Sequence, residues 1–242
     1  MNPTPFKFSK KYSSQVMFDN CKSIAMSFIS NARFAKKKII NACKWLLVLK
    51  NYNNEPPPVF TSITSEGLRV HLGSGSVNLQ GWLNIDARPA KHLHLVKANF
   101  LLDEFTDGSL SEIYLSHVLE HFSFQDVGNL LDIFYSKLSI NGILRISVPS
   151  FDLLVKIYLE NNCNLIYIQS ALMGGQDYPY NFHKSIFNEK SLKVLLSSHG
   201  FKNVSTWDTL SEFGTLLGDF SSSIFKINSI HYPISLNLKC QK

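Results

Sequence analysis

The sequence is poor in cysteine, with four in 242 residues: Cys21, Cys43, Cys163 and Cys240. No two of them form the C-x-x-C pair on which many zinc and redox sites are built. They are also too few and too scattered for the dense framework of a small disulfide-rich domain. The cysteine content therefore argues against a zinc site and a disulfide scaffold, and we expect a reducing compartment.

The sequence also lacks a long apolar stretch. No run reaches the roughly 18 consecutive apolar residues typical of a membrane-spanning helix. The N-terminus does not show the basic, apolar and small-residue segments of a signal peptide. We therefore expect a cytoplasmic protein.

Acidic residues are scarce in the first quarter of the chain. Residues 1–58 contain ten Lys or Arg and two Asp or Glu, a balance of +8, whereas residues 59–242 contain fourteen and sixteen, a balance of −2. A catalytic face that binds nucleic acid should itself be basic. The charge distribution therefore argues against a nucleic-acid substrate.

The basic character has two interpretations. Residues 32–50 contain neither Pro nor Gly and favour a helix, with Lys36 to Lys38 preceding an apolar run from Trp45 to Leu49. Such a segment could lie on an anionic membrane surface, at the inner face of the membrane, or contact a protein partner. Alternatively, it is a helix that packs on the main domain with its lysines in water.

A proline-rich linker follows. Residues 51–58 read NYNNEPPP, and three consecutive prolines cannot continue a helix. We expect a basic helical extension with its linker over residues 1–58 and a single catalytic-sized domain over residues 59–242.

A glycine turn between two apolar runs begins that domain. Leu68 to Leu72 is followed by Gly73, Ser74 and Gly75, and a second apolar run, Trp82 to Ile85, ends at Asp86. Glycines let the backbone pass close to a ligand, and a carboxylate at the end of the next strand can accept both hydroxyls of a ribose. This pattern is typical of a nucleotide-binding α/β unit.

Two better-known glycine motifs are absent. A dinucleotide fingerprint would need a third glycine at Asn78, but the next one is Gly81. There is no G-x-x-x-x-G-K-[ST], so a P-loop is excluded. The Gly-x-Gly alone is equally compatible with a plain turn between two strands.

Five segments in order carry more information than that turn. They are HLGSG, GWLNID, EIYLSHVLEHF, NGILRISVP and MGGQDYPYNFHKSIFNEKSLKVLLSSHGF. In this order the chain resembles the class I S-adenosylmethionine-dependent methyltransferases, from about Leu68 to Phe201. Among them it is similar to small methyltransferase-domain proteins associated with bacterial surface-polysaccharide synthesis. The resemblance implies a Rossmann-like, doubly wound sheet of seven strands and S-adenosyl-L-methionine as cofactor.

Periodicity and stop signals place the remaining elements. We expect turns or only a brief helical turn between the first two strands, a turn at Asn141–Gly142, and an antiparallel pair of strands at the end of the sheet. The predicted strands are Leu93–Phe100, Glu112–Leu115, Ile143–Val148, Phe201–Trp207 and Ser235–Cys240, and the predicted helices are Phe124–Leu138, Phe151–Glu160 and Ser191–Ser198.

The resemblance assigns residues to the cofactor. It implies that Gly73, Ser74 and Gly75 line its methionine part and that Asp86 binds the ribose hydroxyls. Asn99 stands where the family tends to carry an aspartate for the adenine amino group, and its carbonyl can accept the same bond. Ser116 is expected to border the cofactor. The chain departs from the family pattern at two further positions, His71 and Val77.

The run SHVLEH is the most distinctive patch of the chain. His117 and His121 are four residues apart beside Glu120, but H-V-L-E-H is not the H-E-x-x-H of zinc enzymes, and we expect no metal site. His117 and His183 are the candidate catalytic bases for a hydroxyl acceptor. His121 is expected to orient a loop.

A polar and aromatic segment, residues 174–184, follows later in the chain. The resemblance places it over the mouth of the active site, where Tyr178, Tyr180 and Phe182 could form a wall for a sugar or another acceptor. Alternatively, these aromatic residues fill the core beneath an ordinary surface loop.

Together these features predict a methyltransferase that acts on a small-molecule or saccharide acceptor, in the setting of surface-polysaccharide synthesis. A second hypothesis is a non-catalytic partner in a glycan-assembly complex that binds the cofactor weakly, because His71, Val77 and Asn99 depart from the pattern. Methylation of a protein or nucleic acid is a third, which the charge distribution disfavours for nucleic acid.

Overall fold

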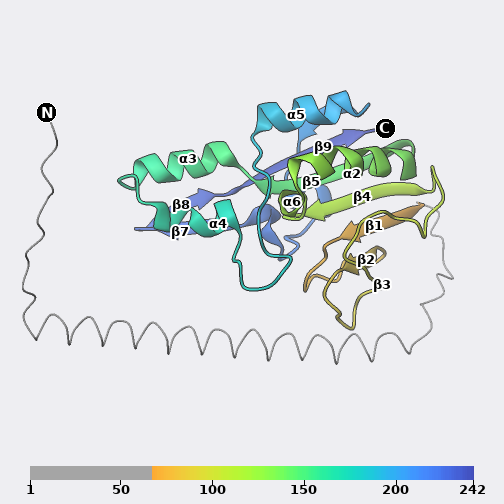
Figure 1. Cartoon of the computed structure of the whole chain (residues 1–242), viewed down its shortest axis with the longest axis horizontal. Helices are drawn as coiled ribbons and strands as arrows, with labels where there is room; N and C mark the ends of the chain where they lie inside the picture. The colour runs from red at the N-terminus through yellow and green to blue at the C-terminus, as the bar shows by residue number, and fades with distance from the viewer. Residues whose placement is uncertain (1–66) are drawn as a thin grey trace, which may run out of the picture. The chain divides into compact units, whose positions relative to one another are not determined.

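The computed structural model describes residues 67–242. Its centre is a seven-stranded sheet with the order β3-β2-β1-β4-β5-β9-β6 (Figure 1). The first five strands in that order run parallel, and β9 is antiparallel to both of its neighbours. The strands are β1 (Leu68–Leu72), β2 (Leu83–Asp86), β3 (Leu95–Val96), β4 (Leu110–Ser116), β5 (Leu138–Pro149), β6 (Lys202–Thr206) and β9 (Ser235–Gln241).

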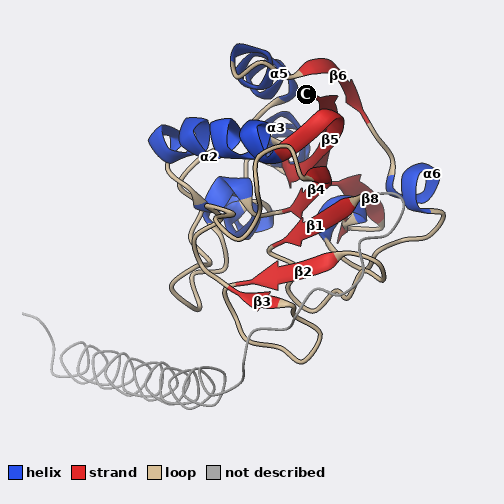
Figure 2. Cartoon of the chain, turned by 90° about the vertical axis from the view of Figure 1, so that its right-hand side faces the viewer, coloured by secondary structure: helices blue, strands red, loops and turns tan. Residues whose placement is uncertain are grey.

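Side chains of the central strands alternate between two buried layers. In β4, Ile113 and Leu115 belong to the main apolar core, whereas Tyr114 between them joins Trp82 and Trp207 on the opposite face. This alternation follows from the two-residue period of a strand. Helices α2 (Phe124–Lys137), α3 (Phe151–Glu160) and α5 (Glu189–Ser198) lie on one side of the sheet and α6 (Thr209–Phe213) on the other (Figure 2).

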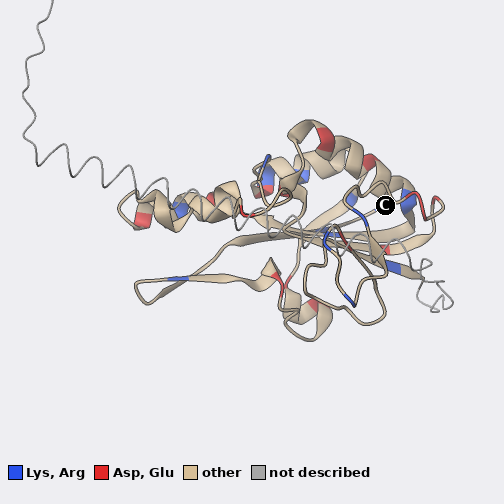
Figure 3. Cartoon of the chain, turned by 60° about the horizontal axis from the view of Figure 1, so that its bottom comes forward, with Lys and Arg blue, Asp and Glu red and all other residues tan. Residues whose placement is uncertain are grey.

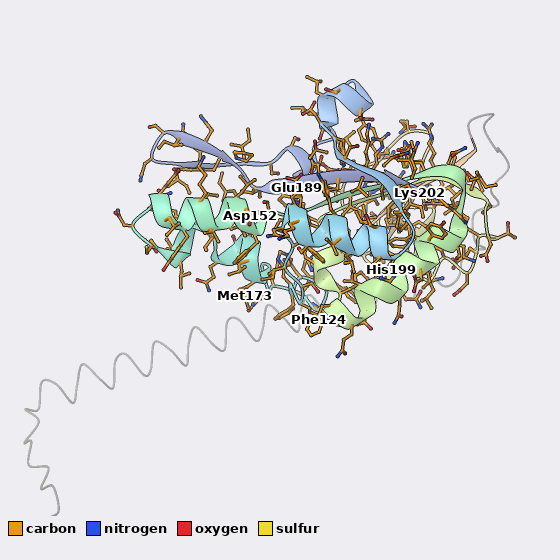
Figure 4. All side chains as sticks on the ribbon, turned by 90° about the horizontal axis from the view of Figure 1, so that it is seen from above. Phe124, Asp152, Met173, Glu189, His199 and Lys202 are labelled. Carbon is orange, nitrogen blue, oxygen red and sulfur yellow. The ribbon has the colours of Figure 1, made fainter. Side chains whose placement is uncertain are left out.

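The three long helices begin at polar caps. The side chains of Ser123, Ser150 and Asn188 each accept a bond from a backbone N–H of the first turn, and Asn188 completes a capping box with Ser191. Asn188 also bonds Asp152 at 3.4 Å, which joins the starts of α3 and α5. Figure 4 shows α2 and α5 next to each other, and His199 bonds Asp132 of α2 at 2.6 Å.

A second, two-stranded sheet forms a smaller apolar core. β7 (Ile224–Ile227) and β8 (Ile230–Pro233) form a hairpin whose turn residues, Asn228 and Ser229, both have positive φ. Ile227 and Tyr232 pack with α3 and with the short helix α4 (Gln169–Met173). The sequence analysis did not predict this hairpin, because its residues show no clear strand alternation and its turn lacks glycine.

Charge on the described residues is mixed. Lys and Arg are interspersed with Asp and Glu over the main sheet and the helices (Figure 3). No helix described from residue 67 onward is both long enough and apolar enough to cross a membrane. The basic extension, the linker and the boundary at residue 58 lie outside the described residues.

The prediction of a doubly wound, seven-stranded sheet is confirmed. β1 and α3 have the predicted bounds, and no helix is described between β1 and β2. The third strand was predicted too long, since β3 has two residues. β5 begins earlier than predicted, at Leu138, and includes Asn141 and Gly142, where the register with β4 shifts and Asn141 has a φ of +63°.

A matched pair of substitutions in α5 tests the assignment of its buried face. Leu192 is fully buried and Val194 is 64 % exposed on the same helix. We expect Leu192→Ala to lower the free energy of unfolding by about 2–5 kcal/mol through lost burial and a residual cavity. Val194→Ala should change it by less than about 0.5 kcal/mol. Urea denaturation measures both, and equal effects would contradict the described packing of α5.

Candidate functional site

A cavity of about 630 Å³ lies at the carboxyl ends of β1, β2 and β4. Parallel strands bring these ends to one edge of the sheet, so segments far apart in the sequence meet there. Residues 73–77, 86–88 and 116–118 follow the three strands and line one part of the cavity. Residues 177–184 and 218–220 line much of the rest, together with Ala98, Phe100, His121 and Phe122.

The turn after β1 requires glycine for two reasons. Gly73 and Gly75 have φ values of +64° and +57°, which residues with a side chain rarely adopt. A Cβ on Gly73 would lie 2.2 Å from Cγ2 of Val118. The turn therefore brings bare backbone to the cavity wall.

Asp86 is fixed at the end of β2 by backbone donors. The N–H of Gly75 donates to Oδ2 at 2.8 Å, and the N–H of Arg88 donates to Oδ1 at 2.7 Å. Each carboxylate oxygen still has a lone pair for a ligand. Because Asp86 is nearly buried and lines the cavity, its carboxylate is held in position to accept hydrogen bonds from ligand hydroxyls.

A polar atom without a partner lies beside this turn. The Oγ atom of Ser74 is buried, and no hydrogen-bond partner is described for it. Such orphan groups are uncommon in folded proteins unless a ligand or water satisfies them. The guanidinium of Arg88 lies 4.8 Å from the centre of the Tyr178 ring, which links the segment after β2 to the later loop.

The chain turns sharply after β4. His117 has a φ of +53°, and its N–H donates to the carbonyl of Ser147 at 2.8 Å, which extends the pairing of β4 with β5 by one residue. The short helix η1 (Leu119–His121) follows at once. This turn places His117 in the cavity and Glu120 beneath it.

The loop over residues 174–184 is tied to η1 by several hydrogen bonds. The N–H groups of Lys184 and Ser185 both donate to the carbonyl of Glu120, at 2.7 and 3.1 Å. Nδ1 of His121 lies 3.2 Å from the carbonyl oxygen of Phe182. The predicted loop over the active-site mouth is therefore held against the segment that carries the SHVLEH run.

Glu120 is surrounded by imidazole rings. Its Oε1 lies 3.4 Å from Nδ1 of His117 and 3.9 Å from Nε2 of His183. The rings of His121 and His183 meet edge to face, with 4.9 Å between their centres. On its other side, Nε2 of His117 bonds the hydroxyl of Ser235 at 2.8 Å.

Burial keeps this cluster uncharged. Desolvation raises the pKa of Glu120 to about 8, and a hydrogen bond from the backbone of Glu120 itself offsets only part of this effect. Desolvation lowers the pKa of His117 to about 3 and that of His183 to about 4, and it also lowers the pKa of His121. The close His–Glu approaches are therefore contacts between neutral groups near pH 7.

A third segment of the wall was missed by the sequence analysis. Asp219 accepts a bond from the buried hydroxyl of Tyr114, and the ring of Phe220 lies 5.2 Å from that of His117. The carbonyl of Phe220 accepts a bond from Ser235. No local sequence motif marks these residues. They reach the edge of the sheet only because the segment between α6 and β7 folds back toward it.

The structure brings most of the predicted site residues together. Those that line the one cavity are Gly73, Ser74, Gly75, Asp86, Ser116, His117 and His183. Asn99 is exposed and is not part of the lining, whereas its neighbours Ala98 and Phe100 are. The two-residue strand β3 ends at Val96, so Asn99 does not belong to a strand that runs from Leu93 to Phe100 as predicted.

Comparison with known proteins gives the following matches. The sequence matches a family model described as a methyltransferase domain over residues 65–206, which is more than half of the chain. No curated protein matches it. A solved SAM-dependent methyltransferase from Archaeoglobus fulgidus is 15 % identical with a TM-score of 0.47, over 81 % of this chain and 93 % of that one.

Two further solved structures are similar to a comparable degree. A SAM-dependent methyltransferase from Thermotoga maritima is 16 % identical, with a TM-score of 0.46, over 87 % of this chain and 99 % of that one. The 1,6-didemethyltoxoflavin-N1-methyltransferase of Burkholderia thailandensis, solved with S-adenosylhomocysteine, is 11 % identical, with a TM-score of 0.42, over 98 % and 93 %. The match to the family model, on a sheet with this strand order, carries the assignment: the chain belongs to the methyltransferase-domain family and is an S-adenosylmethionine-dependent methyltransferase.

Proposed function

We propose that the protein methylates a hydroxyl group of a small-molecule or saccharide acceptor, in the synthesis of a cell-surface polysaccharide. The observation that carries the proposal is one cavity with two unlike halves. One half contains the glycine turn and Asp86, and the other contains aromatic rings and neutral imidazoles. Donor and acceptor can therefore meet within a single cavity.

The cofactor half fits S-adenosylmethionine in three respects. The turn at Gly73 presents bare backbone to the cavity, because Val118 occupies the position that a Cβ would take. The carboxylate of Asp86 keeps a lone pair on each oxygen for the two ribose hydroxyls. The buried hydroxyl of Ser74 lacks a described partner that a polar cofactor group would supply.

The acceptor half suits a sugar ring. Tyr178 is half-buried, and Tyr180 and Phe182 are 48 % and 39 % exposed while lining the same cavity. Asp177 and Asn181, from the same loop, add polar groups that can bond hydroxyls. Aromatic surface with a few placed polar groups is the usual composition of a small-molecule site. The surface-polysaccharide setting rests on the family resemblance, which is an analogy.

The bound cofactor supplies an activated methyl group on a sulfonium. The protein's own contribution is to align the acceptor oxygen with that carbon and to exclude water. In the transfer an oxygen–carbon bond forms, the carbon–sulfur bond breaks with its electron pair left on sulfur, and the acceptor's proton must leave.

His117 and His183 are the candidate proton acceptors. Both line the cavity, and their lowered pKa values keep both rings neutral near pH 7, so each keeps a nitrogen lone pair that can accept a hydrogen bond from an acceptor hydroxyl. The hydrogen bond between His117 and Ser235 and the contact with Phe220 fix the orientation of the His117 ring. We assign the acceptor side of the site to these two residues.

Calorimetric titration with S-adenosylhomocysteine tests the cofactor half. We expect wild type to bind one molecule per chain and Asp86→Ala to weaken binding by roughly 100-fold or more, since a hydrogen bond to a charged group contributes about 1.5–3 kcal/mol. Asp103→Ala removes a carboxylate that is 72 % exposed, and it should bind like wild type. Circular dichroism confirms that each variant is folded.

Absence of binding by folded wild-type protein would contradict the proposal. It would instead favour the hypothesis of a non-catalytic partner. That hypothesis is based on His71 and Val77, which depart from the family pattern. In the structure His71 has a packing role: its ring stacks on Tyr114, and its Nδ1 hydrogen-bonds Oδ1 of Asn84 at 3.2 Å.

A pair of glycine substitutions distinguishes the effect of a steric clash from the effect of a positive φ alone. Gly73→Ala combines a positive φ with a clash against Val118, whereas Gly214→Ala has a φ of +69° and no atom within 4 Å. We expect Gly73→Ala to abolish binding of S-adenosylhomocysteine and Gly214→Ala to leave its affinity unchanged. Normal affinity in folded Gly73→Ala would show that the turn does not shape the cofactor site.

The neutral state of Glu120 predicts a pH-dependent stability. Between about pH 4.5 and 8 the folded state keeps a proton that the unfolded state has released, so the free energy of unfolding falls as pH rises, by on the order of 1 kcal/mol per pH unit. Glu120→Gln should remove this slope, and Glu160→Gln, at an exposed position, should keep it.

The measurement is urea denaturation from pH 5 to 8 with EDTA present, so that adventitious metal ions are excluded. The histidines with lowered pKa values act in the opposite direction below about pH 6.5, but they are common to all three proteins and cancel in the difference. Parallel curves for wild type and Glu120→Gln would show that Glu120 is ionised in the folded protein.

A further inference from the structure

Glu120 is a buried acid that the fold leaves without a partner. It is 1 % exposed, and neither carboxylate oxygen has a hydrogen-bond partner among the described residues. Burying such a group costs free energy that is normally recovered by a counter-charge, a hydrogen bond or a metal ion. Nothing in the proton transfer assigned above requires this carboxyl group.

Two imidazoles point ligand atoms at the same space. One ligand atom from each of Glu120, His121 and His183 can be chosen so that all three lie within 4.8 Å of one another. Two histidines and one carboxylate are a recurrent donor set for divalent transition-metal ions, in open sites that leave coordination positions for other ligands.

The outer hydrogen bonds of both rings suit metal binding. Nδ1 of His121 faces the carbonyl of Phe182, and the backbone of Ala171 and Leu172 hydrogen-bonds the ring of His183. Nε2 of His183 is the nitrogen that faces Glu120. A ligating histidine normally donates its other ring N–H to a carbonyl or carboxylate, which fixes the tautomer and the ring orientation.

We propose that Glu120, His121 and His183 bind one divalent transition-metal ion at the wall of the cavity. The ion would supply the counter-charge that the buried carboxylate lacks. His117 stays outside this donor set, because the group whose ligand atoms all lie within 4.8 Å of one another does not include it.

The role of this metal site rests on the proposed function, to which it adds a means of activating the acceptor. His121 and His183 both line the cavity, so an ion between them would have open positions on the acceptor side. An acceptor hydroxyl bound there would release its proton more readily. His183 would then hold the ion, and His117 would be left to accept the proton.

The sequence analysis expected no metal site, because it considered the SHVLEH run alone. That run supplies Glu120 and His121, but the third ligand comes from the separate loop over residues 174–184. The backbone bonds from Lys184 and Ser185 to the carbonyl of Glu120 bring the two segments together.

The experiment uses the full chain, freed of metal with EDTA and then dialysed. Zn²⁺ and Mn²⁺ are titrated by calorimetry, and Co²⁺ is followed by visible absorption, which reports its coordination. We expect one ion per chain for wild type and a loss of affinity of at least roughly tenfold, the lower end of what changes around metal sites produce, in both Glu120→Gln and His183→Ala. His231→Ala removes an exposed histidine of β8 and should bind like wild type.

No stoichiometric binding by folded wild type would overturn the proposal, as would binding that neither Glu120→Gln nor His183→Ala weakens. Glu120→Gln preserves the shape of the side chain, so it guards against a variant that fails to fold. The same samples are titrated with S-adenosylhomocysteine. If the protein binds the cofactor normally but no metal ion, only the metal site is contradicted. If it binds a metal ion but not the cofactor, only the proposed function is contradicted.

Discussion

The hydrogen bonds to the carboxylate of Asp86 are the constraint on which the rest of the site depends. Gly75 at the end of β1 and Arg88 after β2 both donate to it, so one side chain joins two strand ends across the glycine turn. The turn can close in this way only because Gly73 leaves room for Val118, which follows β4. Three neighbouring strands are thus held in the arrangement that forms the proposed cofactor side of the cavity.

The acceptor side is built differently, from loops held against η1. Two backbone bonds to the carbonyl of Glu120 fix the later loop, and that loop then excludes water from the acid itself. The same contacts that shape the cavity therefore bury an acid among three imidazoles. Stability alone does not favour such an arrangement, and polar groups buried at this cost are typically found at functional sites.

Sequence reasoning succeeded where a local pattern decides the structure. β1 and α3 were predicted with the bounds they have, because an apolar run ends at a glycine turn in one case and Pro149 ends the preceding strand in the other. Gly73 and Asp86, which were selected from such a local pattern, both line the cavity.

The failures all involve contacts between distant segments. The hairpin of β7 and β8 forms against α3, Asp219 reaches Tyr114 from the far end of the chain, and His183 meets Glu120 only through the folded loop. Asn99 was misplaced because the ladder between β2 and β3 stops after two residue pairs, a matter of tertiary packing that strand propensity does not encode.

The most direct test is a crystal structure of the protein with S-adenosylhomocysteine. The ribose hydroxyls should lie within hydrogen-bond distance of both oxygens of Asp86, with the sulfur on the side of the cavity that faces His117 and His183. A ribose bound away from Asp86, or a sulfur that faces away from these histidines, would contradict the assignment of one cavity to both donor and acceptor.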